Sequence, residues 1–345
     1  MKLRIILLAF VAIFALSHGS PLSKAENENR LSKCGSIYKS KVWSGIEANQ
    51  SSAPWALEMH TSSMLCTATL ISSRHALTAT HCFTGIQQEG WSRVVQNKRN
   101  CRNGHYFIED SRILNPIKFQ SNDVYLDTGV KRVILLNACL DKIVPASGDG
   151  KDQIYEDFAI VDLSKDLEFS DTLQPACVAP PGPPVPVGLE LHYFGFGKDP
   201  ESGTVGKLRY EKIKSIENLL RMKSHYFMAI DPDHLRIACP GDSGGGVMST
   251  KGDKVTIIGV LSQTNCMKLA ERKALVPLEI YSSVAYYAKH VCTYSGICSH
   301  GDLAVAKKDD PHEQEMKEME KGKKKADGGW NLPFVALSMI ALMFY

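Results

Sequence analysis

The sequence predicts an all-β domain, and three observations support this. Short runs of β-branched and apolar residues, such as residues 66–71 and 75–79, alternate with turns. No long segment carries the 3.6-residue period of a helix-rich protein, although residues 212–223 follow it in part and predict one weak amphipathic helix. The proline-rich stretch 180–184 suits a linker rather than a central strand. At 345 residues and 44% hydrophobic content, the chain can bury a sizeable core.

Residues 1–20 have the layout of a cleaved secretory signal peptide. Lys2 and Arg4 precede an apolar run over residues 5–16, and small or polar residues follow it. This run is shorter than the roughly 20 residues that a spanning helix needs, which disfavours a permanent membrane anchor. Ten cysteines behind a secretory signal favour disulfides over metal thiolates and predict an extracellular protein. The net charge of +3 gives no indication of a nucleic-acid partner.

The loop 239–246 places one serine among four glycines. Glycine adopts positive φ at little steric cost, so backbone N–H groups in such a loop can point at an oxyanion that forms beside Ser243. A hydroxyl alone is a poor nucleophile, so acyl transfer also needs a base and a carboxylate. His81, within Thr-Ala-Thr-His-Cys, and Asp157, within Asp-Phe-Ala-Ile-Val-Asp-Leu, can supply them. Taken by itself, the loop could equally be a glycine-rich turn.

These three motifs, in the order His81, Asp157 and Ser243, resemble those of the trypsin-like serine proteases. The resemblance implies two six-stranded antiparallel β-barrels, with the active site in the cleft between them and short helices, one of them near the C-terminal end of the domain. It implies peptide hydrolysis by a Ser-His-Asp triad through an acyl-enzyme, with Gly241 and Ser243 as the oxyanion-hole donors. No cofactor or metal is expected. The expected partners are protein or peptide substrates, an activating protease and extracellular inhibitors.

Lys41 and Val42 begin the sequence Lys-Val-Trp-Ser-Gly, which resembles the activation site of this family. Trp43 and Ser44 stand where relatives have Val and Gly. Cleavage after Lys41 would free the Val42 ammonium to pair with Asp242, which makes Asp242 a switch residue. Removing one partner of such a buried pair commonly costs ~3–5 kcal/mol. The alternative is a plain surface lysine at position 41.

In this family, the residue six positions before the nucleophile forms the floor of the primary substrate pocket. Here that residue is Ile237, which favours small or medium apolar side chains over the Lys or Arg that an Asp would select. Ser262 and Thr264 are expected on the opposite wall, where Thr264 replaces a glycine and narrows the entrance. Glu279, aligned through Tyr281, would restore a preference for basic side chains if it reached the pocket.

The ten cysteines are expected to form five disulfides. Three pairings follow from the resemblance: Cys66 with Cys82, Cys239 with Cys266, and Cys34 with Cys177. The last of these would keep the propeptide attached after activation. Two more follow from position in the chain, because each closes a loop: Cys101 with Cys139, and Cys292 with Cys298.

The expected organisation is a signal peptide (1–20), a propeptide (21–41), a protease domain (42–298), a charged stalk (299–330) and a hydrophobic tail (331–345). Asn49 begins the only glycosylation sequon of the chain. Small residues at 326–329 followed by the apolar tail fit a GPI-attachment signal. A tail that inserts uncleaved, or one that packs on the protease, is the alternative.

The leading hypothesis is a zymogen serine endopeptidase that is secreted or tethered to the cell surface. A catalytically silent homologue, which binds partners through the same cleft, is the alternative. Its support is limited to the changes at Trp43, Ser44, Thr67 and Ala68, the last two of which replace glycines of the family pattern. A third class, a structural cell-surface protein, would require the tail to matter more than the cleft.

Overall fold

The computed structural model describes residues 21–36, 48–84, 98–139, 156–217, 225–268, 270 and 276–299. The chain divides into one unit that ends at Cys298 and another that begins at Ser299, and both β-sheets belong to the first unit. The expected signal peptide, the activation residues Lys41 to Ser44 and the hydrophobic tail lie outside the described residues, as does the stalk beyond Ser299.

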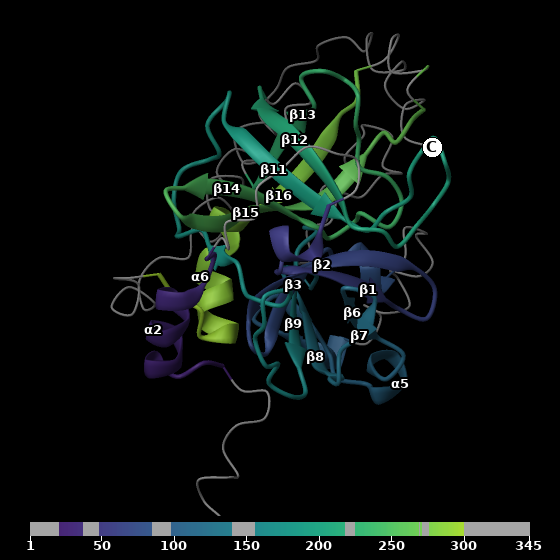
Figure 1. Ribbon diagram of the computed structural model, residues 1–345. Coiled ribbons are helices and arrows are strands. Elements are labelled where there is room, and N and C mark those ends of the chain that lie inside the picture. The colour runs from purple at the N-terminus through teal and green to yellow at the C-terminus, as the bar shows by residue number, and fades with distance from the viewer. Residues whose placement is uncertain are drawn as a thin grey trace, which may run out of the picture. The chain divides into compact units, whose positions relative to one another are not determined.

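Nine strands of the N-terminal half form one antiparallel sheet, in the order β4-β5-β8-β9-β3-β2-β1-β6-β7. The run from β8 to β7 of this sheet is labelled in Figure 1. Strand β9 lies near the middle of this sheet and is buried at all five positions, which fits its largely apolar sequence. The bounds are β1 (Ala56–His60), β2 (Leu65–Ser72), β3 (His75–Thr78), β4 (Cys101–Arg102), β5 (His105–Ile108), β6 (Lys118–Ser121), β7 (Val124–Tyr125), β8 (Val130–Leu135) and β9 (Ala159–Leu163).

The second sheet runs β10-β15-β14-β11-β12-β13-β16, and an additional pairing of β15 with β16 closes six of its strands into a barrel. Strand β10 adds to the outside of this ring, parallel to β15. Closure leaves the six strands without a free edge. The bounds are β10 (Cys177–Val178), β11 (Glu190–Gly195), β12 (Arg209–Ile216), β13 (Tyr226–Ile230), β14 (Gly246–Lys251), β15 (Lys254–Thr264) and β16 (Glu279–Ser283).

The predicted all-β fold is confirmed by these two sheets, with two-residue strands, β4 and β7, at the ends of the nine-stranded one. The helix predicted over residues 212–223 is wrong where the structure describes it, because residues 212–216 belong to β12. There, exposed Lys212 and Lys214 alternate with buried Ile213 and Ser215, so the decisive period is two. Residues 218–224 lie outside the described part of the chain.

Helices are few and short in the described ranges. They are α2 (Lys24–Lys33), α3 (His81–Thr84), α5 (Ser111–Leu114) and α6 (Val284–Ser295), with 3-10 turns η1 (Gln50–Ser52) and η2 (Lys98–Asn100). Helix α6 is the one expected near the end of the domain, and α2 lies beside it (Figure 1). In this part of the chain, no helix has both the length and the apolar character needed to cross a membrane.

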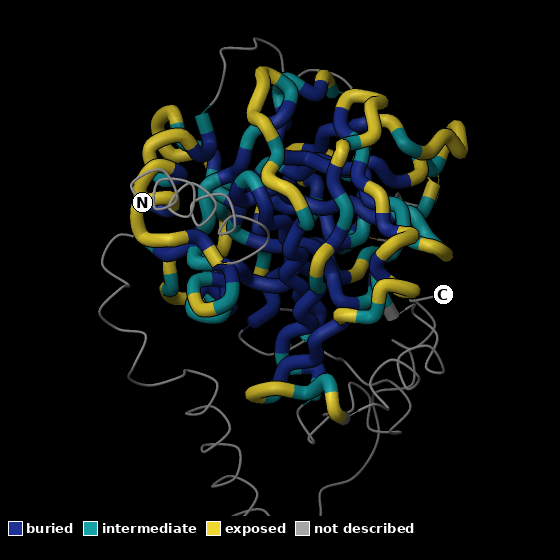
Figure 2. The backbone as a smooth tube through the Cα atoms, turned by 90° about the horizontal axis from the view of Figure 1, so that it is seen from below, coloured by how far each residue is buried: buried dark blue, intermediate teal, exposed yellow. Residues whose placement is uncertain are grey.

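Buried residues fill the interior of the first unit, while exposed residues gather at its periphery (Figure 2). Helix α6 ends at Ser295 and is capped by Gly296, whose φ is 71° and where a Cβ would lie 2.2 Å from the Leu22 carbonyl oxygen. This close approach lets the segment before α2 pack on the end of α6. The structure joins ten cysteines in five disulfides, which are Cys34–Cys177, Cys66–Cys82, Cys101–Cys139, Cys239–Cys266 and Cys292–Cys298.

Candidate active site

The pairing of β3 with β9 brings His81 next to Asp157. In this antiparallel pair, Thr78 at the end of β3 faces Ala159 at the start of β9, so the residues just outside these positions are also neighbours. His81 Nδ1 lies 2.7 Å from Asp157 Oδ2, and the His81 backbone N–H donates to Asp157 Oδ1 at 3.0 Å. The carboxylate therefore contacts both the ring and the backbone of the histidine, which fixes the orientation of the imidazole.

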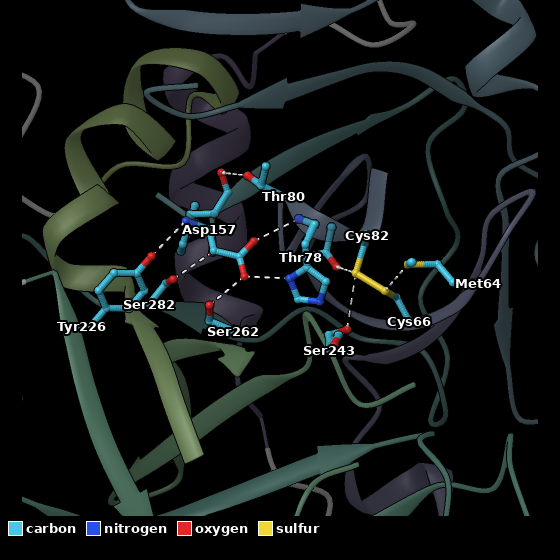
Figure 3. A network of polar contacts seen from close by, with 12 residues as sticks. Met64, Cys66, Thr78, Thr80, Cys82, Asp157, Tyr226, Ser243, Ser262 and Ser282 are labelled. Atoms are coloured by element: carbon cyan, nitrogen blue, oxygen red, sulfur yellow. Dashed lines mark hydrogen bonds and ion pairs between the residues drawn. A yellow bond between two sulfur atoms is a disulfide. The ribbon is translucent and has the colours of Figure 1, made fainter. Parts of the chain in front are cut away.

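Groups from the barrel hold Asp157 in place (Figure 3). Ser262 in β15 donates its hydroxyl to Asp157 Oδ2 at 2.7 Å. Ser282 in β16 donates to the Asp157 carbonyl oxygen at 2.8 Å, and the Asp157 N–H donates to the hydroxyl oxygen of Tyr226 at 3.3 Å. The aspartate thus takes its partners from both sheets.

Burial and the interaction between His81 and Asp157 shift the pKa of each of these two groups in opposite directions. Burial opposes the charged imidazolium, but the Asp157 carboxylate outweighs it and the pKa of His81 is raised. Burial would likewise raise the pKa of Asp157, but the contacts with His81 and Ser262 lower it. The carboxylate thus stays ionised at neutral pH. Its contact with Nδ1 assigns the ring proton to that nitrogen and leaves Nε2 as the basic one.

Ser243 lies beside the histidine segment. The Thr67 N–H donates to the Ser243 carbonyl oxygen at 2.9 Å. Cys82 Sγ lies 3.7 Å from the same oxygen (Figure 3). Because Cys82 follows His81 directly, these contacts bring the three expected triad residues into one region. Among the described residues, the Ser243 hydroxyl has no hydrogen-bond partner, His81 included. Such catalytic contacts are often long before substrate binds.

The loop around Ser243 keeps two N–H groups free of protein acceptors. The Asp242 N–H donates to the Cys239 carbonyl and the Gly244 N–H to the Leu261 carbonyl, both at 2.9 Å. In the described part of the chain, the N–H groups of Gly241 and Ser243 donate to no protein atom. Gly241 has a φ of 101°, and a Cβ there would lie 2.9 Å from Gly197 Cα. Glycine is therefore required at position 241.

Asp242 points away from this surface into the barrel. Its carboxylate accepts hydrogen bonds from the N–H groups of Gly197 and Cys239, both at 2.8 Å. A Cβ at Gly195 or Gly197 would lie 2.1 or 2.2 Å from this carboxylate, which explains the Gly-Phe-Gly sequence there. Burial raises the pKa of Asp242 to about 7. No lysine or arginine of the described residues lies within ion-pair distance of it, and Val42 is not among those residues.

Of the residues predicted to line the substrate pocket, Ile237, Thr264 and Glu279 lie around Ala238, whereas Ser262 bonds the Asp157 carboxylate instead. Ile237 is 7% exposed, and Thr264 donates its hydroxyl to the Ala238 carbonyl at 2.7 Å. Glu279 is 1% exposed, and its two oxygens accept from the Ala238 N–H and the Tyr281 hydroxyl, each at 2.6 Å. Burial raises the pKa of Glu279. The carboxyl group is thus buried and fully bonded within the protein.

A second Ser-His-Asp group lies in the nine-stranded sheet. Ser72 Oγ is 2.8 Å from His75 Nδ1, and His75 Nε2 is 3.8 Å from Asp162 Oδ1. All three residues are at most 1% exposed, so substrate has no access to them. Burial lowers the pKa of His75 to about 3, and we interpret this group as structural. Within the described ranges, no three or more His, Cys, Asp or Glu side chains are placed to hold a metal ion.

Two residues that support the candidate site could not be identified from the sequence. Tyr193 donates its hydroxyl to the Asp242 carbonyl at 2.6 Å, and Thr67 donates its hydroxyl to the Gly241 carbonyl at 3.0 Å. Thr67 stands out in the sequence as a departure from the glycine of the family pattern. That departure was the available signal, but it did not reveal the partner, which lies 174 positions further along the chain.

Comparison with known proteins agrees with this geometry. The chain is 22% identical to phenoloxidase-activating factor 1 of Holotrichia diomphalia over 262 residues, which cover 69% of the chain and 68% of that protein. It is 24% identical to transmembrane protease serine 11A of Homo sapiens over 270 residues, which cover 74% of the chain but 56% of that protein. The family model described as the nematode trypsin-6-like family matches residues 4–298. With its two-sheet fold and this match over most of its length, the chain belongs to the nematode trypsin-6-like family of trypsin-like serine proteases.

Proposed function

We propose that this protein is a serine endopeptidase whose triad consists of His81, Asp157 and Ser243. The observation that carries the proposal is the 2.7 Å contact between His81 Nδ1 and Asp157 Oδ2, beside a serine loop with two free N–H groups. A His-Asp pair beside a serine on a glycine loop is what nucleophilic acyl transfer requires.

In the proposed mechanism, Ser243 Oγ attacks the substrate carbonyl while His81 Nε2 takes the hydroxyl proton. The N–H groups of Gly241 and Ser243 stabilise the oxyanion of the tetrahedral intermediate, where loss of one donor costs about 2.7–4 kcal/mol in a protease with the same chemistry. The imidazolium then protonates the leaving amine and an acyl-enzyme remains. Water deprotonated by His81 hydrolyses the ester, and the proton returns to Ser243. Asp157 maintains the tautomer and stabilises the imidazolium.

The protein is further proposed to be a zymogen that is activated by cleavage after Lys41. Asp242 supports this, because its carboxyl group is buried and bonded to two amides, with no cation of the described residues within ion-pair distance. An ammonium at Val42 would supply the missing positive charge. Asp242 precedes Ser243 directly, so that pairing would act on the conformation of the serine loop.

For the primary substrate pocket, we propose a preference for small or medium apolar side chains. Ile237 provides an apolar floor, and Thr264 is held against Ala238. Glu279 accepts hydrogen bonds from the protein at both oxygens, so it offers no free charge to a basic substrate. Profiling a peptide library with the cleaved enzyme tests this, and preferential cleavage after Lys or Arg would show instead that Glu279 sets the specificity.

The site of action is proposed to be extracellular. The five disulfides are typical of secreted or cell-surface proteins. Asn49 is exposed, as a glycosylation site must be. Attachment through a C-terminal GPI anchor is tested by treating expressing cells with a phosphatidylinositol-specific phospholipase, since full retention on the membrane would contradict it.

The second candidate is a catalytically silent homologue, which the missing hydrogen bond between Ser243 and His81 favours. Protein cleaved after Lys41 should be incubated with a peptidyl phosphonate that carries an apolar side chain, and the adduct measured by mass spectrometry. We expect one adduct on Ser243 and none in the Ser243→Ala variant. A cleaved, folded wild-type protein that forms no adduct would establish the silent homologue.

A further inference from the structure

Three successive carbonyl groups of the loop 241–243 are held by hydrogen bonds. The Gly241 carbonyl accepts from the Thr67 hydroxyl at 3.0 Å, and the Ser243 carbonyl accepts from the Thr67 N–H at 2.9 Å. The Asp242 carbonyl between them accepts from the Tyr193 hydroxyl at 2.6 Å. Two of the three bonds therefore come from one residue, Thr67.

Thr67 connects the nine-stranded sheet to two loops of the barrel. Besides its bonds to the serine loop, its hydroxyl accepts from the Phe196 N–H at 3.1 Å, within the Gly-Phe-Gly segment that packs on Asp242. Its own carbonyl accepts from the Thr78 hydroxyl at 2.9 Å, and the residue is 1% exposed. The N–H, hydroxyl and carbonyl groups of Thr67 therefore all form hydrogen bonds at this junction.

These contacts matter because Gly241 has no side chain to restrict its backbone. A glycine at φ 101° can also adopt other conformations at little cost, so its position requires an external constraint. A peptide unit is planar, and a hydrogen bond to the Gly241 carbonyl therefore fixes the whole Gly241–Asp242 peptide plane. Together with the bond to the Ser243 carbonyl, Thr67 thus fixes the peptide planes on both sides of the unit that carries the Ser243 N–H. That unit is held directly by Tyr193 through the Asp242 carbonyl, and the unit that carries the Gly241 N–H is held through the Pro240 carbonyl, which accepts from the Lys198 N–H at 2.8 Å. Thr67 therefore limits the directions of the two N–H groups through the peptide units next to theirs.

We propose that Thr67 is a positioning residue for the oxyanion site. Its hydroxyl holds the serine loop so that the N–H groups of Gly241 and Ser243 converge before substrate arrives. The inference rests on the proposed peptidase function, but it assigns a role to a residue at which the family pattern has glycine. Glycine at position 67 would leave the Gly241 carbonyl and the Phe196 N–H without this partner.

The test compares Thr67→Val, which removes the hydroxyl at nearly constant volume, with Thr67→Ser, which keeps it. Thr69→Val is the matched control, because Thr69 is equally buried on β2 and makes no hydrogen bond to the loop 241–243 among the described residues. Removal of a whole oxyanion donor costs about 10²–10³ in kcat, so a displaced donor should cost about 10- to 100-fold. We expect this loss in Thr67→Val, with KM changed less than about threefold, and recovery in Thr67→Ser.

A peptide aldehyde separates positioning from general damage to the site. Its carbonyl carbon bonds Ser243 Oγ, the hydroxyl proton passes to His81, and its oxygen then occupies the oxyanion position. Thr67→Val should weaken aldehyde binding about tenfold and leave binding of the corresponding product peptide unchanged. Equal weakening of both ligands, an unchanged kcat, or an equal loss in Thr67→Ser and Thr67→Val would each overturn the proposal.

Amide hydrogen exchange tests the role of Thr67 in protein that has no catalytic activity. In the Ser243→Ala background, Thr67→Val should speed exchange in peptides that cover residues 239–246 about tenfold, while Thr69→Val leaves it unchanged. If wild-type protein fails to react with the phosphonate, the peptidase function is wrong, but this exchange still decides the role of Thr67. Equal exchange in the two valine variants would refute that role.

Discussion

Two buried aspartates show how local contacts decide which carboxyl group can carry a charge. Asp157 receives hydrogen bonds from His81 and Ser262, and its pKa is lowered although it is buried. Asp162, five residues along the same segment, contacts Arg132 but keeps Oδ1 without a hydrogen bond, and burial raises its pKa to about 6. Only the first arrangement provides a permanent carboxylate beside a histidine base.

The raised pKa of His81 predicts the acid limb of the pH profile. The base must be neutral to take the Ser243 proton, so kcat/KM should fall as the pH drops through a midpoint above 6.5, the ordinary value for histidine. In Asp157→Asn, the charge that raises this pKa is gone and burial still lowers it. Histidine NMR in the Ser243→Ala background should then show the His81 titration below its ordinary value.

If His81 titrated with a midpoint below 6.5 in protein that retains Asp157, this account of the His81–Asp157 pair would be contradicted. The control is Ser282→Ala, which removes a bond to the Asp157 carbonyl but none to its carboxylate. Its midpoint should match that of the parent protein. In activity assays, Asp157→Asn should lower kcat by about 10⁴, as the loss of the correct tautomer does in a related triad.

A buried carboxyl pair predicts a loss of stability toward alkaline pH. Burial raises the pKa of Glu211 well above 4.5, and the adjacent Glu279 raises it further, while Glu211 Oε1 has no hydrogen-bond partner among the described residues. The folded state therefore keeps a proton that the unfolded chain has lost. The free energy of unfolding should fall as the pH rises above 4.5, by up to ~1.4 kcal/mol per pH unit for one proton.

Glu211→Gln should flatten this pH dependence, as measured by urea unfolding between about pH 5 and about pH 8. Some slope should remain, because the raised pKa of Asp242 acts in the same direction up to about 7. Glu190→Gln is the control, since Glu190 is exposed in the same barrel and pairs with Lys212. Equal slopes in wild type and Glu211→Gln would show that Glu211 does not hold the extra proton.

At the scale of elements, the alternation of buried and exposed residues and the glycine motifs predict strands and loops. The contacts between the two sheets could not be predicted from local sequence. The strand-like runs at residues 66–71 and 75–79, which largely coincide with β2 and β3, and the loop 239–246 follow from local sequence. The helix error at residues 212–216 arose because Ile213 and Ile216 are three apart, while the exposed Lys212 and Lys214 carried the true period. Thr67 could not be assigned a role, because its partners Phe196 and Gly241 meet it only in the folded chain.

Helix α2 begins at a capping signal that is visible in the local sequence. Residues 21–41 were expected to be a polar propeptide, yet residues 24–33 form a helix that begins with a capping box between Ser23 and Glu26. The helix is bound to the protease body by more than its disulfide. Glu26 pairs with buried Arg74 at 2.8 Å, and Asn27 Nδ2 donates to the Cys298 carbonyl at 2.8 Å.

These contacts predict that the N-terminal piece stays bound after activation even without its disulfide. In Cys34→Ser/Cys177→Ser protein cleaved after Lys41, the fragment that contains α2 should still elute with the body in size-exclusion chromatography. Adding Asn27→Ala leaves the buried Cys298 carbonyl unbonded, at a cost of about 1–3 kcal/mol, and should weaken retention roughly tenfold or more. Asn29→Ala, on the exposed face of α2, is the control. Release of the fragment from the double-serine protein alone would refute the prediction.

At the scale of the whole unit, the candidate site depends on both sheets. His81 follows β3 of the nine-stranded sheet, whereas Ser243 and Ser262 belong to the barrel half, and Asp157 is bonded to groups from both. The resemblance to the trypsin-like proteases predicts such a site, because it places the active site in the cleft between the two halves of the domain. The barrel also contains Asp242 directly behind the serine loop, so a change at its carboxyl group can act on catalysis without touching substrate.

Activation can be tested by a double-mutant cycle on Asp242 and the cleavage site. Lys41→Gln, which prevents cleavage, should slow phosphonate labelling of Ser243 by about 10²- to 5 × 10³-fold, the kinetic equivalent of the ~3–5 kcal/mol lost when one partner of a buried pair is removed. Asp242→Asn in cleaved protein should slow labelling by a similar factor, because the Val42 ammonium then lacks a carboxylate.

Combining Lys41→Gln with Asp242→Asn should slow labelling little further, since both changes break one interaction. Asp253→Asn, which changes an exposed carboxyl group in the turn between β14 and β15 of the same barrel, should label at the wild-type rate. Additive losses in the double variant, or full activity in Asp242→Asn, would separate Asp242 from activation and leave the cleavage at Lys41 without its proposed receptor.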